Sequence, residues 1–147
     1  MILPDVNVLV YAYRREAERH DDYAAWLRQV VAGAEELALV DVVLTGFVRV
    51  VTNPRILAEP APTTAALTFV NVLRSAPRVR WLAPSSAAWA TFAELSTADE
   101  MVRANLVPDA WLAALAISHG CRLATADRGF ARFARLDFFD PVSSARG

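Results

Sequence analysis

Lysine is absent from the sequence, and cysteine and histidine are scarce. All 15 basic residues are arginines, which excludes enzymes that form a Schiff base on lysine and phosphate-binding loops that require one. The single cysteine, Cys121, cannot form an internal disulfide, and the two histidines cannot complete a Cys/His zinc site with it. A lone cysteine is typical of a reducing compartment, so we expect a cytoplasmic protein.

Long hydrophobic runs and a strong net charge are also absent. No segment of about 18 or more apolar residues occurs and no leader-like segment opens the chain, so we expect neither a membrane span nor a signal peptide. The formal net charge is -1, so any contact with nucleic acid must use a local patch. A hydrophobic content of 55% excludes disorder, and the length of 147 residues predicts one domain, 1–147.

Apolar segments of strand length alternate with helical patterns along the chain. The predicted strands are residues 2–6, 37–43, 79–82, 122–125 and 136–139. The predicted helices are residues 20–31, 44–51, 62–73, 86–96 and 108–119, followed by a short helix at 128–134. Strands that alternate with helices predict a parallel sheet with helices on both faces. The expected fold is therefore α/β, a three-layer α/β/α domain with a central parallel sheet of about five strands.

Three aspartates fall where functional groups gather in such a sheet. Asp5 ends the first predicted strand, inside an apolar run, and Asp127 follows the strand at 122–125. Asp109 lies in the first turn of the helix that Pro108 opens. Function in parallel sheets gathers at the carboxyl ends of the strands, so the three can meet at one edge. Each also has an ordinary interpretation, as a helix N-cap or a first-turn acid.

Taken together, these carboxylates favour a divalent metal ion. Several carboxylates at one point repel each other, so at least one would be protonated unless a cation joins them. A small number of oxygen ligands suits Mg²⁺ or Mn²⁺, which keep water molecules and pair with phosphate. The predicted metal ligands are Asp5, Asp109 and Asp127.

Four segments of the sequence form a recognisable series: DVNVL at residues 5–9, FVRVVTNPR at 47–55, VPDAWLAALA at 107–116 and TADRGF at 125–130. Together they resemble the PIN-domain ribonucleases and, more narrowly, the VapC toxins of VapBC toxin–antitoxin pairs. The match has the expected order and spans nearly the whole chain. It implies an endoribonuclease in which Mg²⁺ or Mn²⁺ lowers the pKa of a bound water that cleaves RNA. It also implies that a VapB antitoxin holds the enzyme inactive.

The same resemblance implies roles for individual residues. It gives metal binding to Asp5 and Asp109, completes the acidic cluster with Asp127, and puts Asn7 and Thr125 at polar positions that line the same pocket. It further implies a homodimer and a hydrophobic groove that accepts a segment of the antitoxin as a docked helix.

One position departs from the family pattern. The family normally carries a further carboxylate, usually a glutamate, in the helix after the second strand, but residues 42–58 contain no acid. The matching positions hold Leu44, Thr45 and Gly46. Asp41 is the nearest acid; we expect it to be buried and hypothesise that it replaces the missing ligand if it faces the edge of the sheet. Without a replacement, three carboxylates predict weaker metal affinity and a single well-bound ion.

Two other interpretations compete with the nuclease. A PIN fold that has lost catalysis would act as an RNA- or protein-binding module, and Gly46 in place of an acid motivates this alternative. Receiver and haloacid-dehalogenase domains also end their first strand with aspartate, but they rely on a lysine, which this chain lacks.

Arginines could supply the surface that faces RNA, because guanidinium groups bind phosphate bidentately and stack on unpaired bases. Ordinary surface ion pairs, which contribute little, are the alternative for about half of them. The candidates are Arg14, Arg15, Arg49, Arg55 and Arg128.

Overall fold

A parallel sheet in the order β3-β2-β1-β4-β5 forms the middle layer of the protein, in a computed structural model that describes residues 1–142. Every neighbouring pair of strands in it is parallel. The strands are β1 (Ile2–Pro4), β2 (Leu37–Val40), β3 (Val79–Leu82), β4 (Arg122–Ala124) and β5 (Phe138–Phe139). Because β1 is the central strand, the residue that follows it lies in the middle of the carboxyl edge.

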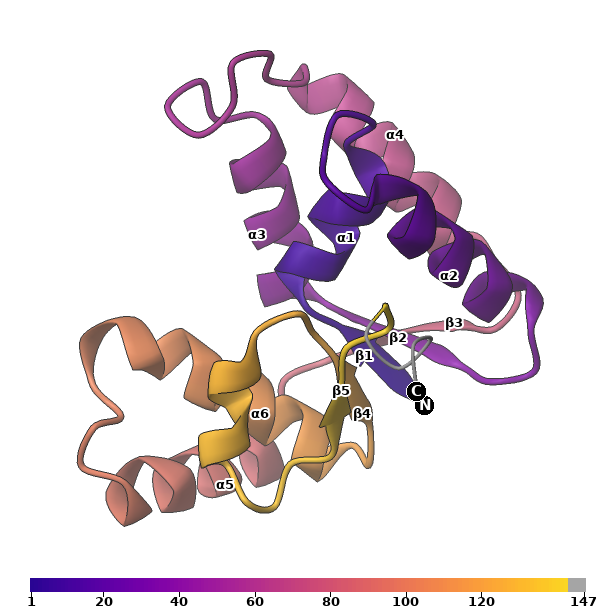
Figure 1. Ribbon diagram of the computed structural model, residues 1–147. Helices are drawn as coiled ribbons and strands as arrows, with labels where there is room; N and C mark the ends of the chain where they lie inside the picture. The colour runs from indigo at the N-terminus through magenta and orange to yellow at the C-terminus, as the bar shows by residue number, and fades with distance from the viewer. Residues whose placement is uncertain (143–147) are drawn as a thin grey trace.

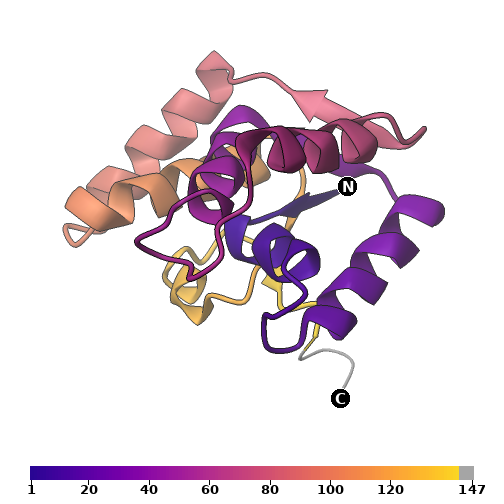
Figure 2. The ribbon, with the colours of Figure 1, turned by 90° about the horizontal axis from the view of Figure 1, so that it is seen from above.

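Helices cover both faces of this sheet. Helices α1, α2, α3 and α4 lie on one face, and α5 and α6 lie on the other (Figure 1). Their bounds are α1 (Val6–Tyr13), α2 (His20–Ala32), α3 (Asp41–Val51), α4 (Thr63–Arg74), α5 (Ser86–Ala98) and α6 (Val107–Ser118), with short 3₁₀ helices η1 (Ala104–Leu106) and η2 (Arg128–Arg132). Helix α1 packs against both α2 and α3 (Figure 2). The predicted three-layer α/β/α fold is confirmed.

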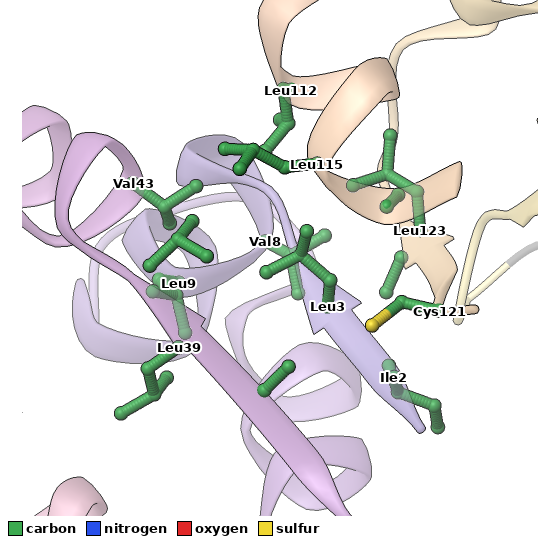
Figure 3. Close-up of a cluster of buried hydrophobic side chains, with 14 of the residues drawn as sticks. Ile2, Leu3, Val8, Leu9, Leu39, Val43, Leu112, Leu115, Cys121 and Leu123 are labelled. Carbon is green, nitrogen blue, oxygen red and sulfur yellow. The ribbon is translucent and has the colours of Figure 1, made fainter. Parts of the chain in front are cut away.

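The core lies on both sides of β1. Leu3 is fully buried in that strand, and Val8 and Leu9 of α1 pack near it with Leu112 and Leu115 of α6 (Figure 3). Helix α6 also buries four alanines, Ala110, Ala113, Ala114 and Ala116. Such small side chains allow a helix to approach its neighbours closely, which holds the start of α6 near the end of β1.

Two differences from the sequence-based expectation bear on the site. Residues 6–13 form α1, a helix that was not predicted, because its sequence VNVLVYAY is apolar nearly throughout and gives no helical periodicity. Strand β2 ends at Val40, so the predicted strand 37–43 was three residues too long. Asp41 instead begins α3, where an acid in the first turn complements the helix dipole.

Helix α6 has clear start and stop signals. Pro108 stands in its first turn, where no backbone donor is needed. Gly120 has a φ of 67°, the left-handed conformation that commonly ends a helix, and β4 follows directly.

Among residues 1–142, no helix has both the length and the apolar character needed to cross a membrane.

Candidate active site

Asp5 lies where the central strand ends and α1 begins. Its backbone N–H still donates to the carbonyl oxygen of Ala124 in the neighbouring strand, at 2.9 Å. Its side chain turns back as the N-cap of α1, and Oδ1 accepts a hydrogen bond from the Val6 N–H at 2.7 Å. The register pairs Pro4 with Ala124, so Asp5 and Thr125 leave adjacent strands side by side.

Thr125 links the polar groups at this edge. Its side chain is polar but only 1% exposed, which is unusual among residues 1–142, where the other buried side chains are hydrophobic. Its Oγ1 donates to Asp5 Oδ2 at 2.7 Å and accepts from the Asp127 N–H at 3.1 Å. Asn7 Nδ2 lies 3.3 Å from both Asp5 Oδ2 and Thr125 Oγ1, while Asn7 Oδ1 accepts from the Ala126 N–H at 3.2 Å. The carboxylate of Asp5 is therefore held in one orientation by three donors.

The two other aspartates reach the same edge from different elements. Asp127 caps η2, and its Oδ1 accepts from the Gly129 N–H at 2.8 Å. Asp109 lies in the first turn of α6, and its carboxylate makes no hydrogen bond or ion pair with residues 1–142. Asp5 and Asp109 line one cleft of about 460 Å³ between α3 and α6.

The three carboxylates lie in one negative electrostatic environment. Burial raises the pKa of Asp5, the hydrogen bonds from Thr125 and the Val6 N–H lower it, and the charge of Asp127 raises it again. Burial also raises the pKa of Asp109, as do the charges of Asp127 and Asp5, while Arg132 partly offsets them. Negative charge is therefore in excess here, which favours a cation.

The carboxylate oxygens at this edge suit a hard divalent ion that binds through few protein ligands. Among residues 1–142, no three acidic, histidine or cysteine side chains are close enough to form a ready-made set of metal ligands. Mg²⁺ does not require such a cage, because it commonly binds through one or two carboxylates and completes its shell with water and substrate phosphate. The carboxylate oxygens of Asp5 and Asp109, beside a third charge at Asp127, match that mode of binding.

Asp41 does not belong to this site. Its side chain is exposed, and Oδ1 accepts a hydrogen bond from Trp81 Nε1 at 2.6 Å. It lines a separate cavity of about 270 Å³ between α3, α4 and β3. The prediction that Asp41 is buried was wrong, because β2 ends at Val40 and α3 begins at Asp41, three residues earlier than the apolar pattern suggested. The structure therefore does not support Asp41 as the replacement ligand.

The cleft-facing side of α3 carries no acid. Val42, Thr45, Gly46 and Arg49 line the cleft from this helix, at the spacing of one helical face. A Cβ atom at Gly46 would lie 2.9 Å from Val6 Cγ2, so the glycine permits the close approach of α3 to the residue after Asp5.

The predicted arginines divide into two groups. Arg14 forms an ion pair with Glu16 at 3.0 Å, the ordinary surface interaction. Arg15, Arg49, Arg55 and Arg128 form none with residues 1–142, and of these Arg49 lines the acidic cleft. Arg132, whose charge lowers the pKa of Asp109, was not among the predicted arginines. Its place in the short helix after Asp127 was a signal that could have identified it.

Comparisons with known proteins identify the family of this chain. The PIN domain family model matches residues 2–136. VapC ribonuclease Mb2897 of Mycobacterium bovis is 42% identical over 142 residues, which cover 97% of this chain and 96% of the relative. Ribonuclease VapC33 of Mycobacterium tuberculosis is 34% identical over 146 residues, which cover 97% of this chain and 99% of the relative.

Solved structures show the same fold at lower identity. VapBC2 from Rickettsia felis, bound to a DNA fragment from its promoter, gives a TM-score of 0.71 at 21% identity and covers 95% of this chain and 98% of that chain. FitAcB from Neisseria gonorrhoeae gives a TM-score of 0.65 at 21% identity and covers 96% of this chain and 98% of that chain. The family model and the full-length relatives show that the chain belongs to the PIN domain family, among its VapC proteins.

Proposed function

We propose that residues 1–147 form a single PIN domain that acts as a Mg²⁺- or Mn²⁺-dependent endoribonuclease toxin. The observation that carries this proposal is the convergence of Asp5, Asp109 and Asp127 at the carboxyl edge of the sheet. Its support is the 42% identity to a relative named as a VapC ribonuclease. A buried lone cysteine suits the reducing cytoplasm, where we propose that the protein acts.

Asp5 and Asp109 would hold the metal ion, and Asp127 would add charge beside them. A bound divalent ion supplies a water of lowered pKa and a positive charge next to the scissile phosphate. Thr125 and Asn7 hold the Asp5 carboxylate in its orientation through Oδ2, while the Val6 N–H holds Oδ1. Geometry and electrostatics are thus the contribution of this chain to hydrolysis.

The experiment is RNA cleavage by purified, antitoxin-free protein with Mg²⁺ or Mn²⁺, compared with an EDTA control. We expect discrete fragments from wild type and a loss of at least about 100-fold in Asp5→Asn and Asp109→Asn, since each removes a charged oxygen donor. Asp137→Asn is the matched control, because Asp137 is exposed at the amino edge of the sheet and should retain full activity.

Thermal unfolding gives a second readout on the same proteins. Mn²⁺ should raise the midpoint of wild type and of Asp137→Asn, and should leave that of Asp109→Asn nearly unchanged, because a ligand stabilises only the protein that binds it. RNA that is bound by every variant but never cleaved in either metal would contradict the enzyme and leave the binding module as the function.

We also propose that a VapB-type antitoxin segment binds a groove between α1, α2 and α4. The groove has an apolar cavity of about 310 Å³ whose wall includes Leu27, Phe69 and Val72. It continues into a second cavity of about 570 Å³ that shares Ala12 and Phe69 with the first. Two of the solved structures with this fold carry the name VapBC, which supports a VapB partner.

A homodimer is the proposed assembly of the toxin itself. Exposed apolar side chains suitable for such an interface lie along α3, α4 and β3, where Val42, Leu67 and Trp81 are each more than two-fifths exposed. Burial of such side chains in a second copy would remove apolar surface from water.

A further inference from the structure

Arg49 supplies positive charge to the wall of the acidic cleft. The cleft lies between α3 and α6, helices on opposite faces of the sheet (Figure 1), and among the described residues that line it Arg49 is the sole cation. Asp109 contributes to the α6 side, and Asp5 lies at the end of the central strand. Arg49 and the carboxylates thus line different parts of one open cleft.

The guanidinium of Arg49 has no partner among residues 1–142. Other arginines pair with acids on the surface, as Arg14 does with Glu16 and Arg135 with Glu94. Arg49 forms no ion pair or hydrogen bond with a described residue, although two carboxylates line the same cleft. Its donors are therefore available to a group that enters the cleft.

The position of Arg49 on α3 explains why it faces the cleft. Helical side chains lean towards the N-terminus of their helix, so Arg49 covers the preceding turn, which contains Thr45 and Gly46. Thr45 and Gly46 line the same cleft as Arg49, so the turn that Arg49 covers is part of the cleft wall. The simpler role, capping of the last carbonyl groups of α3, is not what the side chain does, because it donates no hydrogen bond to them.

We propose that Arg49 binds a phosphodiester group of the RNA substrate in the acidic cleft, an inference that rests on the proposed ribonuclease function. A phosphate that enters between Asp5 and Asp109 meets like charge, and a guanidinium on the facing wall offsets that repulsion. Arginine suits this task because its planar fork donates two parallel hydrogen bonds to phosphate oxygens. The side of the cleft that lacks the fourth carboxylate therefore offers a cation to the substrate.

The test compares Arg49→Gln and Arg49→Lys with wild type, and uses Arg78→Gln as a control with the same change in charge. Arg78 is exposed just before β3, at the amino edge of the sheet and away from the cleft. Binding of a labelled single-stranded RNA oligonucleotide is measured in EDTA over a range of salt concentrations. Cleavage of the same RNA is measured with Mn²⁺.

We expect Arg49→Gln to weaken RNA binding by about 10-fold to 100-fold, as loss of a charge-assisted hydrogen-bonded pair does. The slope of log affinity against log salt should fall by about 0.7, the value of one phosphate contact on a single strand. KM should rise more than kcat falls, Arg49→Lys should restore part of the binding, and Arg78→Gln should behave as wild type.

The outcomes separate the two proposals. If wild-type protein fails to cleave RNA in either metal, the ribonuclease proposal is contradicted. If RNA binding still depends on Arg49 in that case, the proposed contact between Arg49 and phosphate stands. Wild type that cleaves, with Arg49→Gln equal to it in affinity, salt slope and KM, overturns the role of Arg49. An equal loss in Arg49→Gln and Arg78→Gln also overturns it, because the effect is then one of net charge.

Discussion

Thr125 controls the acidic edge although it carries no charge. Its hydroxyl donates to Asp5 and accepts from the Asp127 N–H, so it connects the end of β1 to the loop after β4. It also lies within reach of Asn7 Nδ2. Removal of the hydroxyl would leave three polar groups short of a partner in a buried place, where an unmade hydrogen bond is expensive.

Thr125→Val keeps the shape of the side chain and removes the hydroxyl. We expect the free energy of unfolding to fall by about 1–3 kcal/mol, measured by chemical denaturation, because buried partners lose their hydrogen bonds. The hydrogen bond from Thr125 lowers the pKa of Asp5, so its loss raises that pKa further. A metal ligand must be ionised, and the acidic limb of the pH–activity profile should therefore move to higher pH.

Thr125→Ser is the control for this prediction. Serine retains the hydroxyl, so its acidic limb should stay near that of wild type. An unchanged limb in Thr125→Val would contradict the role of the hydroxyl.

The raised pKa of Asp5 also predicts how the stability of the metal-free protein changes with pH. Because the pKa of Asp5 is raised in the folded state, the ionised carboxylate costs stability at neutral pH, and acidification through that pKa relieves the cost.

The sequence identified the residues that meet at the site better than it identified their surroundings. Asp5, Asn7 and Thr125 form one hydrogen-bonded network, and the charges of Asp109 and Asp127 reach it. Their roles in catalysis stay predictions. The burial of Asp41 was predicted wrongly because an unbroken apolar run does not reveal where the strand ends and the helix begins, and α3 begins at Asp41 itself.

At the scale of elements, the packing of α1 against α3 determines how Asp5 meets the cleft. Val6 follows Asp5, and its Cγ2 would be 2.9 Å from a Cβ atom at position 46. The branched side chain of valine cannot rotate freely out of the way. Glycine at this position therefore serves a close contact between two helices, beside the position where the family pattern has an acid.

Gly46→Ala should lower the free energy of unfolding by up to about 2 kcal/mol. Overpacking costs about 1–3 kcal/mol, and the better helix propensity of alanine returns about 1 kcal/mol. In a Val6→Ala background the obstructing methyl groups are gone, so the same substitution should be neutral or stabilising. Urea unfolding of the four proteins gives the coupling energy, and additive effects would contradict a direct contact.

Most elements were predictable because each carries its own local signal. Ser85 caps α5 by accepting from the Ala88 N–H at 3.1 Å, and Gly120 follows the end of α6 in the left-handed conformation. Helix α1 was not predictable in this way, because it is buried on several sides and tertiary packing decides its conformation. The predicted strand at 136–139 is reduced to Phe138–Phe139 at the edge of the sheet, where pairing exists on one side only.

At the scale of the whole molecule, the proposed antitoxin groove and the acidic edge are separate surfaces. A substitution in the groove should therefore affect inhibition without affecting cleavage. Val72 suits this purpose, because it lines the groove and is 67% exposed, so a charge there leaves the core intact.

Val72→Asp should reduce antitoxin affinity by at least about 10-fold, because binding would bury an unpaired charge, and ribonuclease activity should be unchanged. Met101→Asp is the control, since Met101 is 52% exposed and lies outside the groove. Light scattering after gel filtration reports the masses of the toxin alone and of its complex, and so tests the homodimer in the same run. Full affinity in Val72→Asp would contradict the groove.

The order of elements along the chain has a consequence for synthesis on the ribosome. The residues that line the groove end at Leu73, whereas the acidic edge needs Asp109, Thr125 and Asp127. At about 5–20 residues per second, translation from residue 73 to residue 127 takes roughly 3–11 s. During translation, the residues of the proposed antitoxin groove are therefore complete several seconds before those of the acidic edge. A growing toxin chain thus contains the surface for its inhibitor before it contains the site that the inhibitor blocks.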